Sequence, residues 1–391
     1  MTNSGGLPLS GIRVADFGQF IAIPSATQQF AEMGADVIKV EPPGGEISRN
    51  LGMFGESMLR GSNRGKRSIV LDLKHPRDVA VAERLIASSD VVCHNLRPGT
   101  MERLGFGVER VRGLNPGIIN VSVTGYGPHG PSATRAGLDI AAQAESGLMS
   151  VTGEADGDPQ RVGVAIVDQT TAYLVVQAVL AALLRRERTG LGDDIQIALL
   201  DTAIHMQTMN WMQQDVTGVP ARRKGNGQPN MAMAAEVFKA SDGHFVLSAY
   251  KQEHFARLCE VIGRPSMVHD EKYADARGRL INRRELLDIV GSAFSDRPVQ
   301  ECVKVLSEAG LVSAVIRAYE NVLTAADVVD NETFVQATAV DGTSFSVPVP
   351  PARSSLFDPA VVGGRVPALG EHTAEILAEL GLENAVAAGH E

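Results

Sequence analysis

The chain has 391 residues, 44% of them hydrophobic, so it can bury a large core, and its length predicts two or three domains. The formal net charge of −10 argues against nonspecific binding to nucleic acid or to an anionic membrane, because both need a basic surface. Cys93, Cys259 and Cys302 are widely spaced and form no C-x-x-C motif. They predict reduced, buried thiols in a cytoplasmic protein.

Neither a secretory signal nor a membrane span is expected. The first eleven residues contain no basic side chain ahead of an apolar run. The longest apolar stretch, near residues 172–184, looks too short and too interrupted to cross a bilayer.

Short apolar runs alternate with helical spacing through the first half of the chain. The runs at 12–17 and 35–41 are typical of buried parallel strands, and residues 25–33 between them have the spacing of a helix. The runs at 68–73, 90–96 and 117–127 continue the pattern. Repeated strand–helix–strand units predict an α/β fold with a doubly wound, Rossmann-like large domain.

The second half predicts a smaller α+β domain and a return to the first. We expect the large domain to cover 1–200, a linker to follow at 201–224, and the small domain to span 225–317. Asp242-Gly243 is the expected turn of a hairpin in this small domain. Residues 318–391 are expected to pass through the Pro-rich run VPVPPARSS and to end in a helix on the large domain.

Two glycine-rich segments are similar to nucleotide-binding loops but lack the required context. Gly125–Gly130 satisfies G-x-G-x-x-G, yet Pro128 and Pro131 are poorly placed for the helix that should follow. Gly61–Lys66 is one residue short of a P-loop and leads into a strand. Neither segment predicts a nucleotide site of these types.

Basic and amide side chains gather around two predicted strands. Asn63, Arg64, Lys66, Arg67 and Lys74 bracket one strand, and Asn95, Arg97 and Arg103 follow another. Lys74, Asn95, Arg97 and Arg103 are expected in loops at the carboxyl edge of the sheet, where α/β proteins bind ligands. Their charges suit an anion, although a solvated rim of surface charge remains an alternative.

Asp168 precedes a long apolar segment with helical spacing, expected to be buried on most of its circumference. One interpretation makes Asp168 the N-cap of this helix, accepting the backbone N–H groups of Thr170 or Thr171. The other makes it a reactive carboxylate held by the same donors. The local sequence favours the cap.

Several separated segments together resemble the class III CoA-transferases (CaiB/BaiF type), the family of formyl-CoA transferase and carnitine CoA-transferase. The segments are residues 11–45, 63–74, 94–107, 136–154, 161–188, 225–230 and 368–382. The resemblance implies that Asp168 is a nucleophile that carries an acyl group as a mixed anhydride and then coenzyme A as a thioester. It also implies acyl-CoA and carboxylic acid substrates, no metal, and an interlocked homodimer.

The resemblance further implies particular binding residues. Those for coenzyme A match Ile21, Ala22, Leu71, Lys74, Asn95, Leu96, Arg97 and Arg103. Leu138 and Asp139 match the substrate pocket, and Gly225, Asn226, Gly227 and Gln228 match a glycine-rich lid. The chain departs from the family at Pro42, where some members have arginine, and in its shorter lid.

Two other functions remain open at this point. An acyl-CoA racemase of the same fold would need a proton-carrying histidine in an A-G-H-D motif, but this chain has Leu138 there. A non-catalytic acyl-CoA binder would tolerate any residue at position 168, whereas this chain has an aspartate. Both features favour the transferase.

Overall fold

The computed structural model describes residues 6–228, 230–233, 235–352 and 364–382. The chain divides into two compact units. The large unit comprises Met1–Leu148, Val162–Met209 and Ala326–Glu391, and the small unit comprises Met149–Arg161 and Asn210–Ala325. The large unit is therefore built from three stretches of chain.

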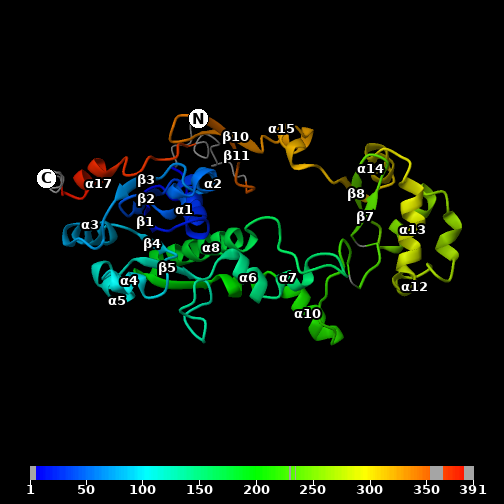
Figure 1. Cartoon of the computed structure of the whole chain (residues 1–391), viewed down its shortest axis with the longest axis horizontal. Coiled ribbons are helices and arrows are strands. Elements are labelled where there is room, and N and C mark those ends of the chain that lie inside the picture. Colours follow the sequence, from blue (N-terminus) through cyan, green and yellow to red (C-terminus); the bar gives the residue numbers. More distant parts are fainter. Residues whose placement is uncertain (1–5, 229, 234, 353–363, 383–391) are drawn as a thin grey trace. The chain divides into compact units, whose positions relative to one another are not determined.

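A six-stranded sheet forms the centre of the large unit (Figure 1), with the order β3-β2-β1-β4-β5-β6. Its strands are β1 (Arg13–Phe17), β2 (Asp36–Glu41), β3 (Arg67–Val70), β4 (Val91–His94), β5 (Ile119–Thr124) and β6 (Asp193–Ala198). Every neighbouring pair is parallel. The predicted doubly wound, Rossmann-like domain is confirmed, and the winding direction reverses between β1 and β4.

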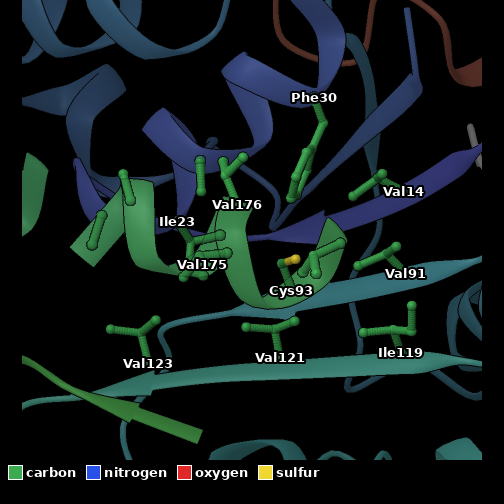
Figure 2. Packing of buried hydrophobic residues seen from close by; sticks show 14 of the residues in the cluster. Val14, Ile23, Phe30, Val91, Cys93, Ile119, Val121, Val123, Val175 and Val176 are labelled. Atoms are coloured by element: carbon green, nitrogen blue, oxygen red, sulfur yellow. The ribbon is translucent and has the colours of Figure 1, made fainter. Parts of the chain in front are cut away.

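Helices cover both faces of this sheet because alternate strand residues are apolar on both sides. On one face α1 (Ala22–Glu32) and α8 (Ile166–Thr189) pack against side chains such as Val14, Val91 and Val121 (Figure 2). The other face carries α3 (Pro76–Ala87), α4 (Thr100–Arg103), α5 (Val108–Leu114) and α17 (Thr373–Glu379). The core is thus two apolar layers, and buried Cys93 lies in the first.

Helix α8 is buried on one side only. Val175 and Val179 lie in the core, whereas Tyr173 is 52% exposed and Leu184 is 52% exposed. The expectation of burial around most of the helix is therefore wrong. At 24 residues α8 is also long and apolar enough to cross a membrane by length and composition, contrary to the prediction. A core helix meets the same criteria, and α8 packs on the sheet.

The C-terminal helix returns to the large unit, as predicted. Glu379 of α17 accepts hydrogen bonds from Arg13 at 2.8 Å and from Arg67 at 2.6 Å, and both arginines begin strands of the sheet. An antiparallel hairpin of β10 (Phe334–Thr338) and β11 (Ser344–Pro348) precedes it. The Pro-rich run therefore begins within a strand, and its end at 353–355 lies outside the described residues.

Helices occupy much of the segment 201–224, which is predicted to be a linker, and its role as a linker stays a prediction. Strand β6 leads directly into α9 (Leu199–His205), and α10 (Thr208–Thr217) follows. Further helical segments of the chain are η1 (Ile47–Asn50), α2 (Gly52–Ser62), α6 (Asp139–Glu145), α7 (Leu148–Val151) and α15 (Ala326–Asp330).

The small unit is an α+β structure around a three-stranded antiparallel sheet. Its strands are β7 (Glu236–Lys239), β8 (His244–Ser248) and β9 (Val312–Val315), in the order β7-β8-β9. Its helices are α11 (Gln252–Val261), η2 (Pro265–His269), α12 (Ala276–Ile281), α13 (Arg283–Phe294), α14 (Val299–Glu308) and η3 (Tyr319–Asn321). The predicted hairpin turn is present, closed by the Ala240 N–H donating to the Gly243 carbonyl at 2.9 Å.

Candidate functional site

A cavity of about 520 Å³ lies where the winding of the large sheet reverses. The loops that follow β1 and β4 leave in different directions there and do not fill the space between them. The lining residues include Gln19–Ala22, Asn95–Pro98, Val123–Gly125, Arg135–Leu138 and Asp168. The cavity therefore brings together the predicted residues Ile21, Ala22, Asn95, Leu96, Arg97, Leu138 and Asp168.

Asp168 is not the cap of α8. The N-cap residue is Ala165, without a side-chain cap, and Asp168 is the third residue of the helix. Asp139 supplies the missing acceptor from α6. Its Oδ2 accepts the backbone N–H groups of Val167 at 2.8 Å and of Asp168 at 3.1 Å. The prediction that Asp168 accepts from Thr170 or Thr171 is wrong, because a carboxylate distant in sequence takes the capping role.

The Asp168 carboxylate is consequently left without hydrogen-bond donors among the described residues, and it is half-buried at the cavity wall. Burial raises the pKa of Asp168, the negative charge of Asp139 raises it further, and the result is about 7. A partly desolvated carboxylate in a cavity is a candidate nucleophile or base.

The loop between β1 and α1 also lines the cavity and is held by several hydrogen bonds. Three successive backbone N–H groups each donate to a different side chain: Gly18 to Asp16 Oδ1 at 2.7 Å, Gln19 to Asn95 Oδ1 at 2.8 Å, and Phe20 to Glu46 Oε2 at 2.9 Å. Phe20 has a φ of +61°, which a residue with a side chain rarely adopts. These bonds stabilise the strained turn beside the cavity.

Asn95 uses both ends of its amide for this purpose. Its Nδ2 donates to the Gln19 carbonyl at 2.8 Å while its Oδ1 accepts the Gln19 N–H. Asn95 therefore holds the loop, and its predicted contact with the nucleotide of coenzyme A stays a prediction.

A buried ionic network lies beneath the loop, and it was not predicted from the sequence. Lys66 Nζ donates to Asp16 Oδ2 at 2.9 Å, and Lys39 Nζ lies 3.0 Å from Glu46 Oε1. All four side chains are buried. Burial alone would raise the pKa of Asp16, but Lys66 and Lys39 lower it to about 2. The available signal was a charged residue inside each of two apolar runs, VADF and VIKVE.

We expect Lys66→Met to destabilise the protein by about 3–5 kcal/mol, because it leaves the buried Asp16 charge without its partner. Urea unfolding monitored by circular dichroism measures this change. Lys74→Met is the matched control, since exposed Lys74 has no carboxylate partner among the described residues and should change stability by less than about 0.5 kcal/mol. Equal effects of the two substitutions would contradict the network's role.

The remaining predicted cations lie at the expected edge of the sheet but not in the cavity. Lys74 follows β3 and Arg103 ends α4, and neither lines the cavity wall. Lys74, Arg97 and Arg103 are all exposed, and no carboxylate of the described chain pairs with them. Leu71 is buried in the core, so its side chain is covered.

Two glycines bring the segment with Leu138 to the cavity. A Cβ atom on Gly125 would lie 2.6 Å from the Gly137 Cα, so only glycine permits this crossing of the two backbones. No helix begins directly after Gly130, since the next one, α6, begins at Asp139, and this agrees with the dismissal of a dinucleotide loop. Lys66 is buried, which likewise agrees for Gly61–Lys66.

The predicted lid belongs to the small unit. The Gly225 N–H donates to the Gly153 carbonyl at 2.9 Å, and Arg283 donates to the Gln228 carbonyl at 2.8 Å. Asn226 is exposed. The lid function of residues 225–228 stays a prediction.

Comparison with known proteins adds to this geometry. A family model described as "CoA-transferase family III" matches residues 9–373. A probable fatty acyl-CoA transferase of Mycobacterium tuberculosis is 35% identical, covering 96% of this chain and 99% of that protein. A succinate–glutarate CoA-transferase of Agrobacterium fabrum is 36% identical, with 95% and 96% covered. The crystal structure of a CaiB/BaiF family protein from Brucella suis superposes with a TM-score of 0.85 at 31% identity, covering 96% of this chain and all of that one.

Proposed function

Since the chain belongs to CoA-transferase family III and is a CoA-transferase, we propose that it moves coenzyme A from an acyl-CoA to a free carboxylic acid through covalent intermediates on Asp168. One observation carries the proposal. The Asp168 carboxylate lines the cavity at the point where the winding of the sheet reverses, and it accepts no hydrogen bond from the described residues. A carboxylate that is not solvated by donors is a better nucleophile toward a thioester carbonyl.

The reaction runs through four exchanges. Asp168 attacks the thioester carbonyl and the C–S bond breaks. Coenzyme A leaves as a thiolate, and the acyl group is then bound to Asp168 as a mixed anhydride. The thiolate attacks the Asp168 carbonyl carbon and releases the first acid, leaving an aspartyl-CoA thioester. The second acid attacks that carbon and expels the thiolate, which then attacks the new anhydride at the second acyl group. This yields the new acyl-CoA and restores Asp168.

The cavity supports this reaction over proton-transfer chemistry on the same fold. Leu138 lines the wall where a racemase would need a histidine, and a leucine side chain cannot carry a proton. The identity of the two acids is open, because the similar proteins are named for fatty acyl, succinate and glutarate substrates. Incubation with a panel of acyl-CoA donors and free acids, followed by mass spectrometry of the new CoA esters, tests transfer and identifies the pair. Absence of any new ester across the panel would contradict the proposal.

We also propose that the exposed cations bind the phosphates of coenzyme A. Arg103→Ala and Lys74→Ala should each raise the KM for acyl-CoA by about 3–10-fold at 20 mM salt, and by less at 300 mM, because salt screens exposed charges. Arg110→Ala is a matched control, since Arg110 is exposed but pairs with Glu83. Initial rates at both salt concentrations measure the effect. A change in KM that is independent of salt would place the phosphates elsewhere.

A homodimer, interlocked as the family resemblance implies, remains part of the proposal. The exposed apolar side chains of α8, Tyr173, Leu180 and Leu184, are the kind of surface that a partner subunit covers. Light scattering across a range of protein concentrations tests the oligomeric state, and a monomer at all concentrations would exclude the dimer. The three buried, unpaired cysteines support a reducing, cytoplasmic location, which fractionation of the source cells would check.

A further inference from the structure

Asp139 holds the beginning of α8 from outside that helix. Its Oδ2 accepts the N–H groups of Val167 and Asp168, and its Oδ1 accepts the Gln143 side-chain amide at 2.6 Å. Buried Gln143 in turn accepts the Val162 N–H at 2.9 Å. Both oxygens of Asp139 are therefore occupied, and both ends of the segment 162–168 are fixed to α6.

We propose that Asp139 is a positioning residue that keeps Asp168 reactive, because its carboxylate accepts the two backbone N–H groups that would otherwise solvate Asp168 and places a negative charge beside it. An aspartate in the first turn of a helix commonly accepts such N–H groups itself, which stabilises its ionised form. In this chain the two donors point to Asp139 instead. The inference rests on the proposed function, in which Asp168 is the nucleophile.

The charge of Asp139 acts in the same direction. The other titratable groups on the elements that pack against α8 do not contribute to the raised pKa of Asp168; they are Glu32 of α1, Glu145 of α6, Asp193 and Asp194 of β6, and Asp201 and His205 of α9. β5 carries no titratable side chain. Of the two arginines that line the cavity, Arg135 pairs with Glu145 at 2.8 Å, and Arg97 has no carboxylate partner among the described residues. Asp139 is thus the charged neighbour that raises the pKa of Asp168.

The arrangement favours acylation. In the free enzyme two carboxylates lie close together, whereas Asp168 is neutral in both the anhydride and the thioester. The repulsion is therefore present before the reaction and relieved once the covalent bond forms. An interaction that destabilises the ionised ground state more than the transition state raises kcat.

The test is Asp139→Asn, which keeps an oxygen acceptor for the helix and removes the charge. We expect the apparent pKa of the acid limb of kcat/KM to fall by at least about one unit, and kcat at pH 8 to fall about 10-fold. A second readout is independent of activity: titration of the Asp168 carboxyl by ¹³C NMR in protein labelled with [¹³C]aspartate, assigned with Asp168→Asn. Asp201→Asn, an exposed acid on α9, is the control and should leave both pKa values unchanged.

An unchanged Asp168 titration in folded Asp139→Asn protein overturns the inference. If this variant fails to fold, Asp139→Glu keeps the charge and moves the acceptor, and an unchanged pH profile with full kcat would also overturn it. The two proposals fail separately. Full activity of Asp168→Ala would remove the nucleophile assignment, whereas an inactive Asp168→Ala together with an unshifted titration in Asp139→Asn removes only the role of Asp139.

Discussion

Asp168→Ala should lower kcat for CoA transfer by at least about 10³-fold while the protein remains folded. Each covalent intermediate of the proposed reaction is formed on this carboxylate, so no other described residue of the cavity can replace it. The substitution does not remove a helix cap, because Asp139 supplies the acceptor for the first turn of α8. The rate of new CoA-ester formation with the substrate pair from the panel measures the loss.

Replacement of Asp168 should also stabilise the protein above neutral pH. Its pKa in the folded protein is raised to about 7 from an ordinary value of 3.8, so the folded state binds a proton more tightly than the unfolded state. The stabilisation of the folded protein by this tighter proton binding is fully present below about pH 4 and is lost as the pH rises through 7. Asp168→Asn avoids the cost, and we expect a gain of about 1–2 kcal/mol at pH 8, discounted because the carboxyl is partly exposed to solvent.

Urea unfolding of the wild type and Asp168→Asn at pH 5 and pH 8 checks the sign, because the gain should be larger at pH 8. Asp201→Asn serves as the control for removal of a surface carboxylate. Wild-type turnover in Asp168→Ala would exclude the nucleophile, and a gain of Asp168→Asn over the wild type that is no larger at pH 8 than at pH 5 would contradict the raised pKa.

The large sheet could be predicted because both of its faces are covered. Strands buried on both sides need unbroken apolar runs, such as Val91–Cys93, and the helices between them carry a single apolar stripe. The hairpin β10–β11 and the strand β9 were missed because their side chains are largely half-buried or exposed, and their sequences are not distinctive. The local sequence pattern identifies a helix or strand only where burial restricts which side chains that segment can carry.

The candidate site shows the same limit more sharply. Asp168 and the segment around Asn95 could be located from the family resemblance, but their hydrogen bonds could not. The cap of α8 comes from Asp139, 29 positions earlier in the chain, and the partner of Asp16 is Lys66, 50 positions later. Such pairs form only when the fold brings them together, so local capping rules favoured the wrong acceptor. The exposed side of α8 was missed because its apolar composition indicates burial.

Hydroxylamine added during turnover should inactivate the enzyme, and only when an acyl-CoA is present. The anhydride and the thioester on Asp168 are both electrophilic at the Asp168 carbonyl carbon, whereas the free carboxylate is not. Hydroxylamine attacks that carbon and expels the first acid or the CoA thiolate, leaving an aspartyl hydroxamate. Because a hydroxamate cannot repeat the exchange, activity should fall to below about 10% of its starting value as the modification accumulates.

Peptide mass mapping locates the product, which should appear in the peptide that contains Asp168 within residues 161–185. Three incubations make the result specific: enzyme with hydroxylamine alone, enzyme with acyl-CoA alone, and Asp168→Ala with both reagents should all stay unmodified at this peptide. A proton-transfer enzyme forms no acyl-enzyme and would survive the treatment. Full activity after prolonged exposure to both reagents, with the Asp168 peptide unchanged, would exclude a covalent intermediate on Asp168 and with it the proposed mechanism.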